Sequence, residues 1–240
     1  MLRPPVSDGT GLTTCHVTGQ GPSLRPPLHP LDPAAAAQLR VECAQLQAAA
    51  RLLGLPEAAL LAAASFLLRY RCTARSALPA REVVPAALFL ALKVQETARR
   101  TSDLLQAVAA DAPVLVGDAY YERKAELCAA ELALLKALGF ELGTPLEPHQ
   151  QLLNQAAQQG APAGLVRVAC AALRDALLTS HAAQRHSAAA LGGGALLVAG
   201  ALLGREAQPG GPPCGDAWAG GDCDAAADIA AALVWHGTQL

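Results

Sequence analysis

The sequence predicts an all-α protein made of two tandem helical units. Hydrophobic residues make up 52% of its 240 residues but aromatic residues only 3%, so alanine, leucine and valine must fill the core. This palette favours helices that pack closely through small side chains over a sheet rich in β-branched and aromatic residues. Apolar residues recur at helical spacing, and no segment shows the alternation of a half-buried strand.

The chain opens with a segment that predicts no regular structure. Residues 1–33 are rich in Pro, Gly, Ser and Thr, which is typical of a flexible leader. The character changes at Pro33, which is expected at the first helical position with Asp32 as a candidate N-cap. Five helices are then expected in the first unit, residues 34–145, at about 33–54, 56–72, 80–97, 99–111 and 118–140.

The second unit, residues 146–240, is also predicted to consist of consecutive helices, with a less regular pattern. The segment GTPLEP cannot continue the preceding helix and marks the boundary. Three glycines, Gly192–Gly194, interrupt one of the expected helices at a cost of about 1 kcal/mol each relative to alanine. They predict either a weak helix or a very close helix crossing. Helical segments are expected at about 145–160, 163–180, 186–204 and 224–237, and a mobile loop without bound metal is expected at 205–222.

The composition argues against several classes of protein. Lys and Arg total 18 against 20 Asp and Glu, so no overall basic field exists to hold nucleic acid, and a protein partner is favoured. No Ser/His/Asp arrangement, HExxH motif or phosphate-binding loop stands in a suitable context, and LGGGAL lacks the flanking strand and Lys-Ser/Thr of a P-loop. The apolar segment 188–204 is at the short limit for a bilayer span, so a buried core helix is favoured.

Cysteine usage indicates buried free thiols in a reducing compartment. None of the seven cysteines forms a CxxC pair, and four lie in apolar helical runs. Cys214 and Cys223 lie nine residues apart without clustered histidines, which argues against zinc. No metal or other cofactor is therefore expected.

One motif asks for a specific explanation, because Lys93 interrupts the apolar run PAALFLALKVQETARRTSDLL. This stretch resembles the third helix of a cyclin box and the turn that follows it. Upstream, ECAQLQAAARLLGLPEAALLAAASFLLRYRCTARS resembles the first two helices, particularly those of L-type cyclins. Downstream, AELALLKALGFEL resembles the fifth helix. The likeness covers about residues 36–145 through motifs in the right order, and residues 146–240 only through helix count and order.

The resemblance to transcription-type cyclins implies two tandem five-helix cyclin boxes, the second more divergent, and a kinase-binding role for four residues. Lys93 matches the lysine of the third helix and Glu131 the glutamate of the fifth; together they would bind backbone groups at the end of the kinase's αC helix. Phe89 lies one turn before Lys93 and could belong to the core or to the interface. Glu96 could contact the kinase or merely pair within its helix. Lys93 alone could be a lysine snorkelling from an apolar face.

Arg99 and Arg100 resemble the basic pair of L-type cyclins, although an exposed loop explains them equally simply. The sequence also departs from the family. Gln95 replaces the first of two usual acidic residues, and AQLRVEC replaces the substrate-docking element of cell-cycle cyclins.

The function that the resemblance implies is that of a regulatory subunit without catalytic groups. It would bind and activate a cyclin-dependent kinase in the nucleus, in transcription by RNA polymerase II or in RNA processing. Two alternatives remain open. A general transcription factor of the TFIIB kind shares the two-box fold but needs a basic stripe for DNA. The second alternative is a helical scaffold that does not activate a kinase.

Overall fold

The computed structural model of the chain describes residues 33–73, 78–109, 116–143, 147–179, 182–204 and 221–237. The leader, the Asp32 cap, Cys214 and all but the last two residues of the loop expected at 205–222 lie outside the described residues. Within them the chain forms ten helices and no strand, which confirms the predicted all-α class.

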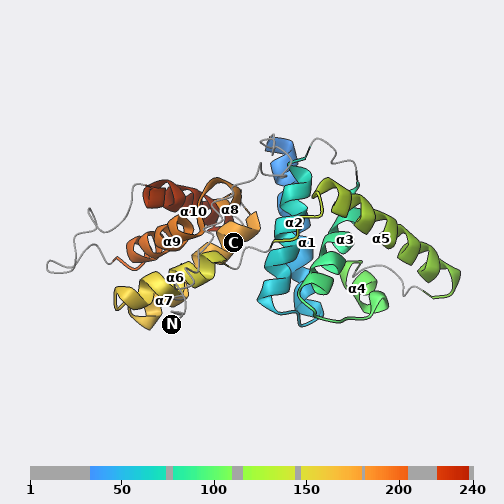
Figure 1. The fold of residues 1–240 in the computed structure, drawn as a ribbon, viewed down its shortest axis with the longest axis horizontal. Coiled ribbons are helices and arrows are strands. Elements are labelled where there is room, and N and C mark those ends of the chain that lie inside the picture. The colour runs from blue at the N-terminus through green and yellow to red at the C-terminus, as the bar shows by residue number, and fades with distance from the viewer. Residues whose placement is uncertain are drawn as a thin grey trace, which may run out of the picture.

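The first five helices form one bundle around a central helix (Figure 1). Helix α3 packs against each of the other four, and its residues Val83–Leu88 and Leu90–Leu92 are buried. A helix that is apolar nearly all round belongs in a core, which explains its place. The helices span Pro33–Leu52 (α1), Glu57–Arg71 (α2), Ala80–Val94 (α3), Thr101–Val108 (α4) and Asp118–Ala137 (α5).

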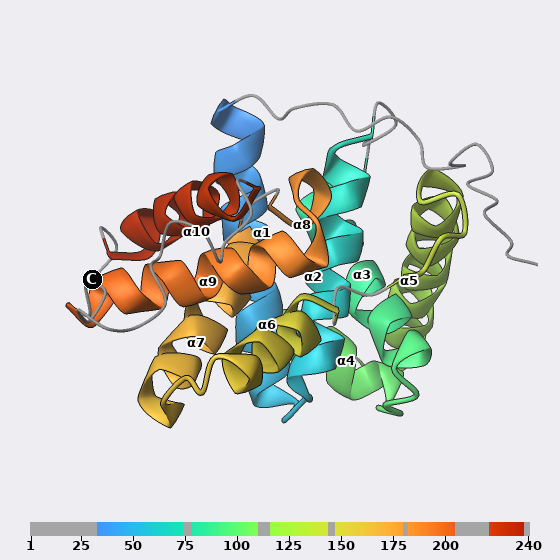
Figure 2. The ribbon, with the colours of Figure 1, turned by 60° about the vertical axis from the view of Figure 1, so that its left-hand side comes forward.

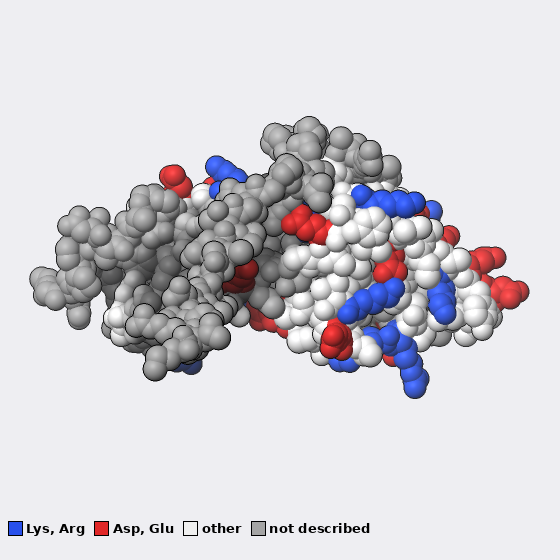
Figure 3. Space-filling view, viewed as in Figure 1, with Lys and Arg blue, Asp and Glu red and all other residues white. Residues whose placement is uncertain are grey.

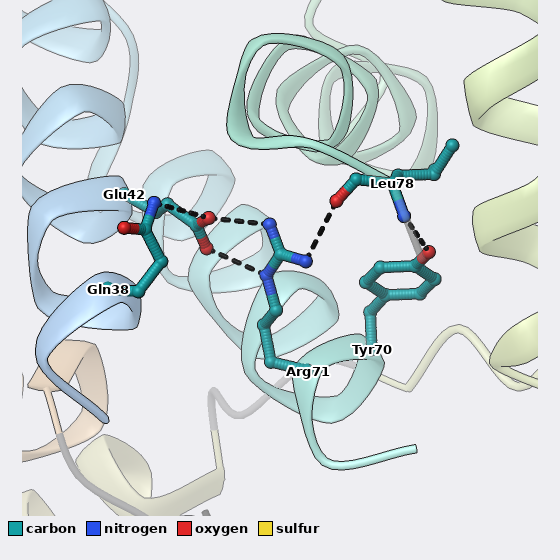
Figure 4. A network of polar contacts seen from close by, with 5 residues as sticks. All are labelled: Gln38, Glu42, Tyr70, Arg71 and Leu78. Atoms are coloured by element: carbon teal, nitrogen blue, oxygen red, sulfur yellow. Dashed lines mark hydrogen bonds and ion pairs between the residues drawn. The ribbon is translucent and has the colours of Figure 1, made fainter. Parts of the chain in front are cut away.

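A buried ion pair joins α1 to α2 (Figure 4). The Glu42 side chain is fully buried, and Arg71 Nε donates to its Oε2 at 2.9 Å. Gln38 donates to the same carboxylate, while Arg71 also donates to the carbonyl of Leu78. Tyr70 completes the network by accepting the Leu78 amide at its hydroxyl. The network therefore ties the start of the third helical segment to the first two helices.

A proline inside α3 creates a contact with α5. Pro85 has no amide hydrogen, so the carbonyl of Arg81, four residues earlier, lacks its helical donor. Arg123 of α5 supplies one, its Nη2 lying 2.9 Å from that oxygen. The proline is therefore tolerated because another helix satisfies the group that it leaves free.

The remaining five helices form a second bundle around α9 (Figure 2). The triple glycine marks a close helix crossing on both sides of α9. A Cβ at Gly192 would lie 2.7 Å from the amide nitrogen of Leu152 in α6, and one at Gly194 would lie 2.8 Å from that of Ala226 in α10. The helices span Glu147–Gln158 (α6), Ala163–Thr179 (α7), Ala182–Arg185 (α8), Ala188–Leu202 (α9) and Gly221–Gly237 (α10).

Two features in this half of the chain differ most from the sequence prediction. Helix α10 begins at Gly221, so the last two residues of the expected loop are helical. The short helix α8 was not predicted, because four residues carry too little periodicity to be recognised. No helix among the described ranges is long and apolar enough to span a membrane.

The bundles meet through α7, which packs against α1 and α2 (Figures 1 and 2). At this junction Arg174 of α7 lies 3.8 Å from Glu57 at the start of α2. The fold predicted from the sequence, two tandem five-helix bundles, is confirmed.

Candidate protein-docking site

The structure brings Lys93 and Glu131 together on neighbouring helices. Lys93 stands in the last turn of α3, and its Nζ lies 2.7 Å and 2.8 Å from the two carboxylate oxygens of Glu131 in α5. The lysine side chain is 52% exposed, whereas the glutamate side chain is only 11% exposed. The pair thus presents its cationic end to solvent while its carboxylate is held between helices.

Phe89 supports the lysine from below. Its ring centroid lies 4.1 Å from Lys93 Nζ, a cation–π contact, and the ring is half-buried against the core. Phe89 therefore packs against the core, as one of its two interpretations expects, and also contacts the ammonium of Lys93. Leu90 and Leu92 on the same helix are buried.

Helix α3 ends earlier than predicted, at Val94 and not at residue 97. The Thr97 amide donates to the carbonyl of Leu92 and the Glu96 amide to that of Lys93, which closes the helix with a Schellman motif. Glu96 occupies the left-handed position with φ of 50°, where glycine is usual. The sequence offered no glycine to signal this end.

The Glu96 side chain is exposed, and its carboxylate makes no ion pair or hydrogen bond with any other residue that the structure describes. The interpretation of Glu96 as an intrahelical partner is therefore wrong, because the residue lies beyond the helix. Its carboxylate remains available to a partner.

Arg99 caps another helix. Its Nε donates to the carbonyl of Leu53 at 3.3 Å, and its Nη2 lies 3.5 Å from that of Gly54, at the end of α1. A guanidinium at a helix C-terminus satisfies free carbonyls and complements the helix dipole. The exposed-loop interpretation thus holds for both arginines, which are exposed just before α4, and Arg99 also contacts the end of α1.

The residues between these contacts line a small cavity beside Lys93. Its volume, about 240 Å³, is below the range typical of small-molecule sites and suits one or two side chains of a protein partner. The lining residues are Phe89, Leu92, Lys93, Glu96, Thr97, Ala98 and Arg99. All four residues expected to bind the kinase are at this cavity or, as with Glu131, bonded to one that is.

The sequence analysis did not single out the exposed apolar residues of α5 and its end. Tyr121, Leu132 and Phe140 are 66%, 48% and 63% exposed, and Cys128 is also exposed. Phe140 has φ of 59°, an unusual conformation for an aromatic residue. The spacing 121, 128, 132 could have revealed a second apolar stripe on this helix.

The cysteines only partly match the expectation of buried thiols. Of the five described, Cys43 and Cys72 are buried, Cys170 is half-buried, and Cys128 and Cys223 are exposed. Burial raises the pKa of Cys43 to about 12 and that of Cys72 to about 11, so both are protonated at neutral pH. No group of three or more His, Cys, Asp or Glu residues suited to a metal occurs in the described part of the chain.

Comparisons of the chain with known proteins identify its fold. No family model and no curated protein sequence matches. A chain in the crystal structure of the yeast RNA polymerase II CTD kinase CTDK-1 complex matches with a TM-score of 0.68 and 17% identity, over 82% of this chain and 65% of that one. A chain of the Chaetomium thermophilum CAK complex bound to ATP-γ-S matches with a TM-score of 0.57 and 16% identity, over 90% of this chain and 67% of that one.

The chain therefore shares the two-bundle fold of chains found in two protein kinase complexes, and spans about two thirds of their length. At these identities the likeness concerns the fold.

Proposed function

We propose that the chain is a cyclin-like regulatory subunit that binds and activates a cyclin-dependent protein kinase. The observation that carries the proposal is the Lys93–Glu131 pair, positioned beside a cavity in a fold shared with chains of two kinase complexes. The docking surface consists of Lys93, Glu131, Phe89 and Glu96.

The chemistry of the pair suits the end of a docked helix. Terminal turns of a helix leave backbone carbonyls and amides without partners. The Lys93 ammonium has three protons and uses two of them to bond the two carboxylate oxygens of Glu131. The third proton can be donated to another group, and the carboxylate oxygens can accept further hydrogen bonds. Lys93 can therefore donate to a carbonyl of the partner while Glu131 accepts an amide, and both bonds are charge-assisted.

The proposed mechanism uses binding energy and no catalytic group of this chain. A kinase is active when its αC helix is turned inward and its Lys–Glu ion pair is formed. A subunit that binds only that arrangement shifts the population of the kinase toward it. The exposed apolar residues Leu132, on α5, and Phe140, just beyond its end, could supply contact area that the small cavity lacks.

The match to a chain of an RNA polymerase II CTD kinase complex supports a role in transcription or RNA processing, and hence in the nucleus. A DNA-binding role of the TFIIB kind finds no support on the face shown in Figure 3, where acidic and basic side chains are interspersed over the first bundle. Such a role needs a continuous basic stripe.

Reconstitution with purified cyclin-dependent kinases tests the proposal. The full chain is expected to form a stable heterodimer with at least one kinase of a panel and to raise its activity on a peptide of RNA polymerase II heptad repeats. Lys93→Ala and Glu131→Ala should reduce both effects. Arg185→Ala is the matched control, because it breaks an exposed ion pair with Asp228 in the second bundle. Failure of every kinase to bind the wild-type chain would overturn the proposal.

A further inference from the structure

A groove runs along the junction of the two bundles, and its lining includes none of the four residues of the docking surface. One cavity of about 460 Å³ opens between α2, α6 and α7, and another of about 270 Å³ opens between α1, α2 and α7. Glu57 and Arg174 line both, so their ion pair lies between the two. We call these cavities together the junction groove.

Hydrogen-bond donors dominate its charged and polar lining. Arg51 of α1 is exposed and has no ion-pair partner among the residues in the described ranges. Arg174 is the second guanidinium, although its Nε and Nη2 also donate to Asp175 Oδ1 at 3.2 Å and 3.1 Å. Gln47 adds an amide donor. Glu57 is the one carboxylate among the described residues that line either cavity. Two guanidiniums therefore line the groove against one carboxylate.

His149 adds a further donor. Its Nδ1 is buried without a hydrogen-bond partner, and burial lowers its pKa, so the ring is neutral at pH 7. A buried N–H without an acceptor costs about 1–3 kcal/mol, so the proton belongs on Nε2. The ring lines the larger cavity, and its Nε2–H is the group that a ligand can meet.

The same groove has an apolar wall and a weak internal ion pair. Leu61 and Ala171 line the larger cavity, and Leu178 lines the smaller one. The Glu57 and Arg174 side chains are 53% and 43% exposed and lie 3.8 Å apart. An exposed pair at this distance contributes little, so an incoming carboxylate can replace Glu57 beside Arg174 while the guanidinium keeps its ion pair with Asp175.

We propose that the junction groove binds an extended acidic peptide segment of a partner protein. Carboxylates of the segment pair with Arg51 and Arg174, a backbone carbonyl accepts the His149 N–H, and an apolar side chain enters the larger cavity. Ligand sites favour such positions between domains, where a concave apolar surface carries a few converging polar groups. The proposal uses no residue of the kinase-docking surface and is independent of it.

The test uses the full chain and two labelled heptapeptides, Asp-Glu-Leu-Asp-Glu-Leu-Asp and its amide counterpart Asn-Gln-Leu-Asn-Gln-Leu-Asn. Fluorescence polarisation at low and high salt measures their affinities. The acidic peptide is expected to bind about tenfold more tightly than the amide peptide, with the difference shrinking as salt rises. No binding of the acidic peptide up to about 1 mM, or equal binding of the two, overturns the proposal.

Variants locate the site. Arg51→Gln and Arg174→Gln should each lower the affinity for the acidic peptide about fivefold or more. Glu57→Gln removes the competing carboxylate and should raise that affinity severalfold. Arg167→Gln is the matched control, an exposed arginine on α7 outside the groove. The Arg51 side chain has no ion-pair partner in the part of the chain that the structure describes, so its variant stays informative if Arg174→Gln disturbs the junction. Effects no larger than that of Arg167→Gln place the peptide elsewhere and overturn the proposal.

Discussion

Lys93 and Glu131 form one ion pair, but they differ in how much water reaches them: the lysine side chain is 52% exposed and the glutamate side chain 11%. Removing one partner is therefore not equivalent to removing the other. Without Lys93 a largely buried carboxylate loses its cation, whereas without Glu131 the ammonium remains hydrated and still lies over Phe89.

The first prediction separates stability from binding at this pair. Lys93→Met keeps the aliphatic stem and should destabilise the free chain by about 1–2 kcal/mol, since the carboxylate is left unpaired. Glu131→Gln keeps an acceptor for the lysine and should cost less than about 1 kcal/mol. Urea unfolding measures both. Kinase affinity should fall about tenfold or more in each variant, because a docked charge then lacks its partner.

A large loss of stability in Lys93→Met with unchanged kinase affinity would show that the lysine is structural. The fold would remain correct, and the docking role would be wrong.

Glu96 offers a sharper separation, because its backbone and its carboxylate predict opposite effects. Glu96→Gly relieves the left-handed strain at φ of 50° and should stabilise the chain by up to about 1 kcal/mol. Glu96→Gln leaves the backbone unchanged and should leave stability unchanged. If the carboxylate contacts the kinase, both variants bind it more weakly. Thermal unfolding and kinase titration of the same preparations give the two readouts, and equal kinase binding by all three proteins would remove Glu96 from the docking surface.

The glycines of α9 should tolerate no side chain. Gly192→Ala or Gly194→Ala places a methyl group within 3 Å of backbone atoms of α6 or α10 and should destabilise the chain by about 1–3 kcal/mol despite the better helix propensity of alanine. Gly164→Ala is the matched control, because nothing lies within 4 Å of its added Cβ. That variant should be neutral or slightly stabilising. Similar melting temperatures for all three variants would contradict the close crossing.

The buried Glu42–Arg71 pair predicts strong coupling. Arg71→Met leaves a fully buried carboxylate uncompensated and should cost about 3–5 kcal/mol. The double variant Glu42→Met, Arg71→Met should recover much of that loss, because both charges are then absent. A double-mutant cycle by denaturant unfolding measures the coupling, and additive losses would show that the two side chains act independently.

Thiol reactivity should follow burial. Cys128 and Cys223 should react with a thiol reagent in the native protein at pH 8, while Cys43 and Cys72 should react only on unfolding. The raised pKa of Cys43, about 12 against an ordinary 9.0, means that the unfolded state loses this proton first as pH rises. The contribution of the Cys43 thiol to the free energy of unfolding is therefore constant below pH 9 and falls between about pH 9 and 12. Cys43→Ala should flatten that part of the profile, as measured by urea unfolding across the pH range.

Sequence reasoning found the helices because they leave local signals, whereas the pairing of Lys93 with Glu131 was expected only from the resemblance to the cyclin box. Helical spacing of apolar residues identified α3 and α5, and one lysine in an apolar run identified Lys93. The Schellman end at Glu96 was missed, because its hydrogen bonds form at a residue that has no intrinsic preference for that conformation. The role of Arg99 was also missed, since the carbonyls that it caps lie 45 and 46 residues earlier in the chain.

The junction groove left no signal in the sequence for a related reason. Arg51 and His149 belong to different bundles, and neither has an unusual neighbour along the chain. Only the packing of α7 onto α1 and α2 places them on the same groove.

The carbonyl freed by Pro85 has a consequence for the alignment of α3 and α5. Arg123 donates a hydrogen bond to the carbonyl of Arg81 near the start of α3, and Glu131 pairs with Lys93 near its end. The two helices are therefore joined at two points. One residue inserted into α5 between Arg123 and Glu131 would turn everything beyond it by about 100° around the helix axis. Helix α5 could then keep either the contact of Arg123 with Arg81 or that of Glu131 with Lys93, but not both. The contact between Arg123 and the carbonyl freed by Pro85 thus fixes the register of α5 along α3. That register sets which part of α3 the Glu131 carboxylate contacts.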